Sequence, residues 1–194
     1  MLKKFSLAVF TVMLMAVTSL AATWTVDIPH SSVNFTVKHL VISKVTGKFD
    51  GFSGTINFDG ENLDKGSVEF TVDMATVDTD NENRDNHLKS ADFFDVEKFP
   101  KMTFKSTKVI PGEDNEFKLV GNLTIRDVTR EVTFDCVFNG VVSFMGATKA
   151  GFSARTTIDR QDFNVSWSKS LDSGGLVVSD EVEIYIEIEA NQES

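Results

Sequence analysis

The sequence has 194 residues, with 19 Lys or Arg against 29 Asp or Glu, so its formal net charge is −10. This charge argues against nucleic acid as a partner, whose phosphates require a basic surface, and against adsorption to an anionic membrane face. The single cysteine excludes an internal disulfide, and 17 Phe against one Tyr predict a large apolar interior that is poor in polar groups.

Residues 1–21 have the pattern of a secretory signal peptide. A lysine pair at positions 3 and 4 precedes an apolar run over residues 5–17, and small residues follow at 19–21. The apolar run is short for a bilayer span, which takes about 20 residues. We therefore expect cleavage after residue 21 and an exported mature domain over residues 22–194.

Most of the mature sequence alternates between apolar and polar residues. In chain order, alternating runs occupy residues 33–39, 68–74, 117–125, 132–138, 149–158 and 182–188. A period of two is typical of strands that bury one face and expose the other, which is the pattern of antiparallel sheets. Glycine-containing pairs at 59–60, 111–112, 139–140 and 174–175 predict turns between the strands.

One segment, residues 80–99, breaks the alternation and predicts one or two short helices. Asp80 is the expected cap of the first helix and Ser90 that of the second, and Pro100 ends the segment. Eight or so strands with a short helical insert make one all-β domain, either a barrel or a sandwich. We favour a barrel, because the regular final strand over 182–190 is suited to pair with the first strand and remove an exposed edge.

The sequence contains no motif of catalysis or metal binding. Its three histidines, His30, His39 and His87, form no HxH or HExxH pattern, and neither a Gly-rich phosphate loop nor GxSxG occurs. Cys136 lies in an apolar alternating run, which favours a buried thiol over a nucleophile. We therefore expect no catalytic residue and no metal. An enzyme acting on a small hydrophobic substrate stays an alternative, and it requires an inward-facing acid–base pair such as His39 with a carboxylate.

Three polar residues fall where an apolar cavity would have its mouth. His39 extends the apolar face of the strand that starts at residue 33, and Arg84 and His87 lie in the helical insert between two strands. Two interpretations stay open: ordinary surface or hydrogen-bonded residues, or a polar mouth. With the inward apolar positions, the candidate ligand-binding set is Phe35, Val37, His39, Phe70, Val72, Arg84, His87, Leu88, Phe93, Phe94, Phe104, Leu119 and Phe134.

Several longer motifs follow one another along the chain. WTVDIPHS stands at 24–31, RDNHLKS at 84–90 is followed by DFFDV at 92–96, and IDRQDFNV stands at 158–165. With these motifs the sequence resembles the YceI family of exported lipid-binding proteins over residues 24–190. Asp127 and Asn164 stand where we expect glycine in the family pattern, and both positions are expected turns that Asp and Asn tolerate.

The resemblance implies a lipocalin-like, eight-stranded antiparallel barrel with an elongated apolar cavity. It implies a periplasmic protein that binds, transports or stores a long amphiphile: a polyisoprenoid, an isoprenoid quinone or a fatty-acid derivative. A bound isoprenoid-type lipid is then expected, and no cofactor is required. Some relatives form homodimers, and a transient contact with a membrane protein is open. The alternative outside the lipid-binding class is a stress-response interaction module whose core is filled by its own Phe side chains.

Overall fold

The computed structural model describes residues 22–60, 62–172 and 174–193, so the predicted signal peptide lies outside the described residues. In chain order the elements are β1 (Ala22–Val26), the 3-10 turn η1 (Ile28–His30), β2 (Ser32–His39), β3 (Ser43–Phe49), β4 (Phe52–Phe58), β5 (Ser67–Asp73), η2 (Met74–Thr76), β6 (Val77–Asp78), α1 (Glu82–Lys89), β7 (Lys101–Pro111), β8 (Glu116–Ile125), β9 (Val128–Phe144), β10 (Ala147–Asp159), η3 (Arg160–Phe163) and β11 (Val178–Gln192). Within these ranges no helix is both long enough and apolar enough to cross a membrane.

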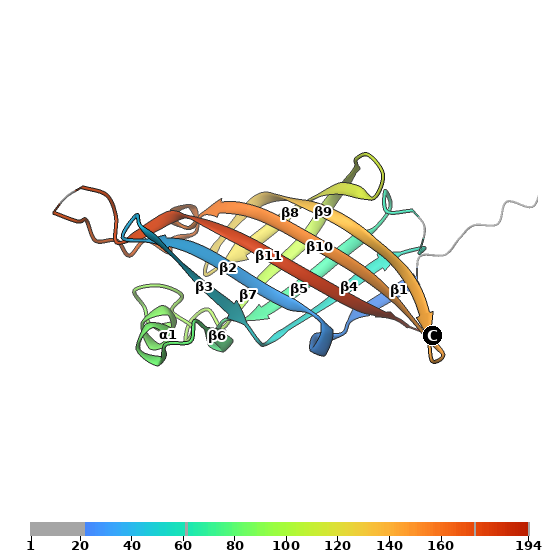
Figure 1. The fold of residues 1–194 in the computed structure, drawn as a ribbon, viewed down its shortest axis with the longest axis horizontal. Helices are drawn as coiled ribbons and strands as arrows, with labels where there is room; N and C mark the ends of the chain where they lie inside the picture. Colours follow the sequence, from blue (N-terminus) through green and yellow to red (C-terminus); the bar gives the residue numbers. More distant parts are fainter. Residues whose placement is uncertain (1–21, 61, 173, 194) are drawn as a thin grey trace, which may run out of the picture.

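The strands form one closed, eight-stranded antiparallel barrel, as predicted (Figure 1). The order β1-β4-β5-β7-β8-β9-β10-β11 runs around the barrel, and β11 returns to pair with β1 and β2. The first pass of the chain along the barrel wall, residues 22–39, is divided into β1 and β2 by η1, which contains Pro29. The second pass, residues 43–58, is divided into β3 and β4 at Asp50-Gly51. The final strand therefore closes the sheet against the first. On its outer side β3 pairs, in the described part of the barrel, only through Lys48 and Phe49, with the two residues of β6.

Alternation along each strand places one face in the interior. In β8 Phe117, Leu119, Gly121, Leu123 and Ile125 are all buried, and every residue between them is more exposed. The side chains of a strand point to its two sides in turn, so a closed barrel collects all inward faces in one lumen. The local period that predicts the strands thus also predicts which residues line the interior.

Aromatic rings pack across the interior at the end of the barrel next to the β9–β10 hairpin. Trp24 and Phe58 are each 1% exposed, and their ring centroids are 5.0 Å apart. The Phe58 ring also meets Phe138 and Phe152 edge-on, at 5.7 and 5.6 Å. This aromatic cluster, Trp24, Phe58, Phe138 and Phe152, fills one end of the lumen.

The helical insert is smaller than predicted. Only α1 forms, and the predicted second helix is a series of turns, because Ser90 ends α1 instead of beginning another helix: its hydroxyl donates to His87 O at 2.7 Å. The cap of α1 is Asn81, whose side chain accepts from the Arg84 N–H at 3.0 Å. The prediction of Asp80 as this cap was wrong, since Asp80 has a left-handed φ of 59°.

One predicted turn is also corrected. Asn139-Gly140 lies within β9, beside an irregularity in its pairing with β10, and the hairpin turns instead at Met145-Gly146, with φ of 51° and 83°. Asp127 lies in the turn between β8 and β9, as predicted, and the left-handed residue of that turn is its neighbour Arg126. Asn164 does adopt the left-handed conformation that its position at an expected glycine implies.

Candidate functional site

Two cavities lie in line within the barrel. The first has a volume of about 120 Å³ and the second about 260 Å³. Along β11 the lining passes from Val178 and Val182 in the second cavity to Ile186 and Ile188 in the first. Ile184 lines both cavities, together with Val33 and Met102. The two cavities are therefore adjacent compartments of one lumen, separated by a waist of three apolar side chains.

Every residue of the predicted ligand-binding set lines one of these cavities. The first cavity has Phe70, Val72, Phe104, Leu119 and Phe134, and the second has Phe35, Val37, His39, Arg84, His87, Leu88, Phe93 and Phe94. The predicted polar mouth is thus assembled in one place, since His39 from β2 and both residues from α1 share the second cavity.

Sequence reasoning missed other lining residues. Met102 and Ile184 lie on regular strands, and the alternation of β7 and β11 carried the signal that would have found them. Trp167 and Arg160 come from the segment between β10 and β11, where no periodicity marks a side chain as inward. Their positions depend on the path of a loop, which local sequence does not specify.

The charged and histidine side chains that line the lumen are confined to its second compartment. Among the residues that the structure describes, no charged side chain and no histidine lines the first cavity, whereas His39, Arg84, His87 and Arg160 line the second. The described lining of both cavities contains no carboxylate. The lumen therefore has an apolar end and an end that offers hydrogen-bond donors.

Arg84 is held at the mouth by the strand that precedes its helix. Its Nε donates to Thr79 Oγ1 at 2.7 Å, and its Nη2 donates to Thr79 O at 2.6 Å. The buried carboxylate of Asp85 in turn accepts from the Thr79 N–H at 2.9 Å and from its hydroxyl at 2.5 Å. This network fixes one side of the guanidinium, and Nη1 has no partner among the described residues.

His87 and His39 differ in their surroundings. His87 Nε2 is 3.0 Å from Asp92 Oδ2, and its ring meets Phe93 and Trp167 edge-on at 5.0 and 5.3 Å. The His39 side chain has no hydrogen-bond partner in the part of the chain that the structure describes. The His39–carboxylate pair named for the enzyme alternative is therefore not formed there. His87, which also lines the second cavity, does pair with a carboxylate, but the His87 and Asp92 side chains are 42% and 59% exposed.

Arg160 organises the loop beside the mouth. It is 5% exposed and donates to Val165 O and Trp167 O at 2.5 and 2.8 Å and to Ser179 O at 2.9 Å. Its Nη2 also donates to Asp180 Oδ1 at 2.8 Å. Burial lowers the pKa of Arg160 from its ordinary value. These bonds pin both ends of the segment that brings Trp167 to the second cavity.

A cluster of ionisable groups lies outside the lumen, at η1. His30 Nδ1 is 3.1 Å from Asp27 Oδ2, and Glu189 is close enough to complete a group of three potential metal ligands. Lys149 Nζ lies between the carboxylates, 2.7 Å from Asp27 and 2.6 Å from Glu189. The ammonium group therefore bridges the two carboxylates of this cluster and offsets part of their negative charge.

The chain matches known proteins over nearly all its described length. The model of the YceI-like domain matches residues 24–190. The UPF0312 protein SA2479 of Staphylococcus aureus is 38% identical over 161 residues, which cover 82% of this chain and 91% of that protein.

Solved structures show the same architecture. The Campylobacter jejuni YCEI protein is 37% identical and superposes with a TM-score of 0.72, covering 81% of this chain and 90% of that one. A polyisoprenoid binding domain from Saccharophagus degradans shares the fold at 16% identity and a TM-score of 0.66, covering 89% and 99% of the two chains. By its sequence and its barrel, the chain belongs to the family of proteins with a YceI-like domain.

Proposed function

We propose that this protein binds one long amphiphilic lipid, with its apolar chain along the two cavities and its head group among the donors of the second. The observation that carries this proposal is the lumen itself: an apolar compartment continuous with one that holds His39, Arg84 and His87. Each methylene moved from water into such a lumen contributes about 0.8 kcal/mol. Binding therefore strengthens with chain length, and one methylene more or less changes it little.

The donors at the mouth favour a particular class of head group. Arginine offers only donors, and each histidine offers at least one. With no carboxylate in the lining, a head group that accepts hydrogen bonds is favoured, such as a quinone carbonyl, a carboxylate or a phosphate. A polyisoprenoid or isoprenoid quinone satisfies both requirements, and the related Saccharophagus degradans domain is described as polyisoprenoid binding.

With the export that the sequence predicts, the proposal extends to a periplasmic protein that carries or stores its lipid. The interaction-module alternative requires a lumen filled by the protein's own Phe side chains, and the two cavities argue against it. The enzyme alternative lacks the His39–carboxylate pair among the described residues. The family points the same way, toward a binding protein.

Native mass spectrometry of the protein purified from its own periplasm tests the proposal. We expect one lipid per chain, and lipid extraction identifies it. Ala154 lines the first cavity, so Ala154→Phe should fill the lumen and reduce the bound lipid at least tenfold, or by about 1.4 kcal/mol. The matched control is Ala147→Phe, the same change at an exposed position of the β9–β10 hairpin. A wild-type protein without lipid, or an Ala154→Phe variant with a full lipid complement, would contradict the proposal.

A further inference from the structure

The turn between β2 and β3 exposes apolar side chains beside the second cavity. Leu40 and Val41 are its two central residues, with left-handed φ of 53° and 67°, and the Ile42 N–H donates to His39 O at 3.2 Å. The residues Val41 and Ile42 are 63% and 86% exposed. We refer to Leu40, Val41 and Ile42 as the β2–β3 tip.

The backbone of this tip is unfavourable for the residues that it contains. Three residues separate the paired residues His39 and Ser43, and the β-turn over residues 39–42 has two left-handed central residues, a conformation that favours Asn-Gly. Each ordinary L-residue in that conformation costs about 1–2 kcal/mol, and a β-branched one such as Val41 is a real outlier. Asn and Gly at positions 40 and 41 would remove both the backbone strain and the exposed apolar surface. Folding alone therefore does not account for the apolar residues at this turn.

The tip continues the rim of the second cavity. The Leu40 N–H donates to Val177 O at 2.9 Å, and both His39 and Val177 line that cavity. Val41 packs against the loop that precedes β11, since a β-carbon on Gly175 would lie 3.0 Å from Val41 Cγ2. The apolar lining of the lumen is therefore connected to the exposed tip through adjacent residues.

The β2–β3 hairpin has a net positive charge, which suits an anionic phospholipid surface better than the net negative charge of the whole protein does. Residues 32–49 contain three lysines and no carboxylate, in a chain with a net charge of −10. Lys44 pairs with Glu183 of β11 at 2.9 Å, whereas Lys38, next to the tip, has no ion-pair partner within the described ranges. Lys48 pairs with Asp50 and Asp78, at 3.1 and 3.5 Å, so the hairpin lysine that stays available to a lipid phosphate is Lys38, next to the tip.

We propose that the β2–β3 tip inserts into the surface of a phospholipid bilayer and so places the mouth of the second cavity against the membrane. This inference rests on the proposed function, because a lipid carrier must exchange its ligand with a bilayer. The aromatic cluster lies at the other end of the lumen, whereas the donors of the second cavity lie beside the tip, so exchange at the tip brings the lipid head group to the bilayer surface. The apolar side chains carry the binding, so it should depend weakly on salt.

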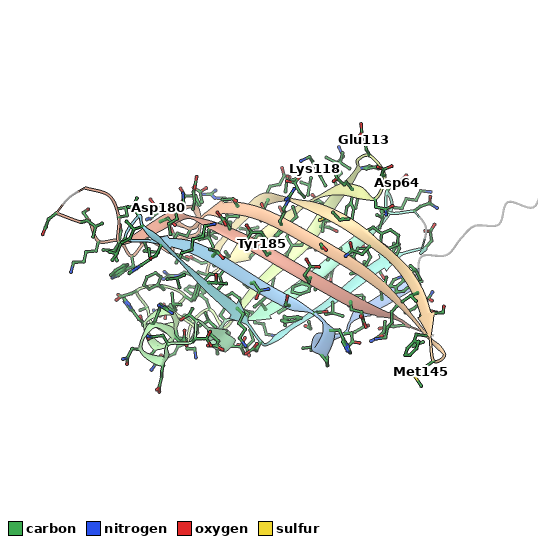
Figure 2. The ribbon with its side chains drawn as sticks, viewed as in Figure 1. Asp64, Glu113, Lys118, Met145, Asp180 and Tyr185 are labelled. Carbon is green, nitrogen blue, oxygen red and sulfur yellow. The ribbon has the colours of Figure 1, made fainter. Side chains whose placement is uncertain are left out.

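The opposite end of the barrel offers a control position for variants of the β2–β3 tip. Met145, at the turn of the β9–β10 hairpin, is 90% exposed, and Figure 2 shows it at the far end of the molecule from Asp180, which lies beside the β2–β3 tip. Between these ends β11 runs for 15 residues, or roughly 50 Å along the strand at about 3.3 Å per residue. A variant at Met145 therefore changes an equally exposed apolar tip without touching the mouth.

Flotation with vesicles of phosphatidylethanolamine and phosphatidylglycerol tests the inference. We expect Ile42→Asp to lower the partition coefficient onto vesicles about tenfold or more, with Met145→Asp unchanged. The double variant Leu40→Asn with Val41→Gly supplies the favoured turn, so it should unfold at the same or a higher temperature and still lose vesicle binding. This second variant separates loss of the apolar tip from loss of the fold.

Three outcomes would overturn the inference: no vesicle binding by the wild type, equal loss in Ile42→Asp and Met145→Asp, or loss in Met145→Asp alone. The lipid that copurifies is measured in the same preparations. A protein that holds lipid but ignores vesicles refutes the tip and leaves the proposed function intact. A protein without lipid whose vesicle binding depends on Ile42 refutes the proposed cargo and supports the tip as a membrane contact.

Discussion

The ring of Phe35 lies against the backbone of Gly47, its register partner on the next strand, so closely that a β-carbon at position 47 would stand 2.4 Å from Phe35 Cζ. The same closest approach, 2.4 Å, occurs in two further pairs, Phe70 with Gly54 and Phe104 with Gly121. All three rings line the cavities. Because each glycine leaves its inward position empty, the ring on the neighbouring strand lies along the wall, and the lumen between the walls stays open.

Replacing one of these glycines should therefore close part of the lumen. In Gly54→Ala the new methyl group displaces the Phe70 ring toward the first cavity, and the overpacking should cost about 1–3 kcal/mol of unfolding free energy. We expect less lipid per chain by native mass spectrometry and a lower urea midpoint. Gly151→Ala is the control, because the nearest atom to its new β-carbon is Asn139 Cβ, at 3.3 Å. Equal lipid content in Gly54→Ala and wild type would contradict this role for glycine.

The thiol of Cys136 should be unreactive in the folded protein. Burial raises its pKa to about 12, and the residue is 5% exposed. At pH 8 only about one thiol in ten thousand would be ionised, and the thiolate is the species that reacts with Ellman's reagent. We expect no colour from the native protein within an hour and one equivalent after unfolding in guanidinium chloride. Rapid reaction of the native protein would show that this wall of the first cavity is open to solvent.

Asp27 should contribute stability that depends on pH. The hydrogen bond from Lys149 holds the pKa of Asp27 below its ordinary value of 3.8. A carboxyl group whose pKa is lower in the folded than in the unfolded protein stabilises the fold at pH values above its unfolded-state pKa. This contribution is lost as the pH falls through its folded-state pKa. Asp27→Asn should therefore lower the free energy of unfolding at pH 7, and its difference from wild type should shrink below about pH 4.

The control for this change is Asp135→Asn. Asp135 also pairs with a lysine, Lys118, but both side chains are 56% exposed, so water screens the pair. Urea unfolding at pH 7, 5 and 3 compares the two variants. A difference for Asp27→Asn that stays constant over this range would show that packing, not charge, stabilises the site.

The fold was largely predictable because its main signal is local. A period of two in residues such as 117–125 specifies both the strand and its inward face, and every inward face of a closed barrel meets in one lumen. This is why all the predicted ligand-binding residues line the cavities. Two features had no such signal: the β2–β3 turn, whose Leu40-Val41 pair looks like a continuing strand, and the inward position of Trp167, which depends on a loop.

The predicted turn at Asn139-Gly140 and the predicted helix start at Ser90 were wrong because local sequence chemistry did not decide the structure there. Asn139-Gly140 has turn chemistry, yet β9 passes through it to Phe144, because the pairing with β10 takes up the irregularity there. Ser90 has the chemistry of a helix start, yet the structure uses it to end α1. Tertiary pairing decides between such local alternatives, and one sequence does not contain the partner's position.

Arg160 should be a positioning residue for the mouth, because its four hydrogen bonds tie the loop carrying Trp167 to the start of β11. Arg160→Lys keeps the charge but cannot reproduce the guanidinium fork, so the carbonyls of Val165 and Trp167 lose donors. We expect a loss of about 2–4 kcal/mol of unfolding free energy and faster release of bound lipid to acceptor vesicles.

In a Trp24→Phe background Trp167 is the remaining tryptophan, and its emission should shift to the red as the loop leaves the second cavity. Gln161→Ala provides the control, since it removes another donor to Asp180 Oδ1 without touching the loop carbonyls. If Arg160→Lys lowered stability but left both Trp167 emission and lipid release unchanged, Arg160 would stabilise the barrel without shaping its mouth.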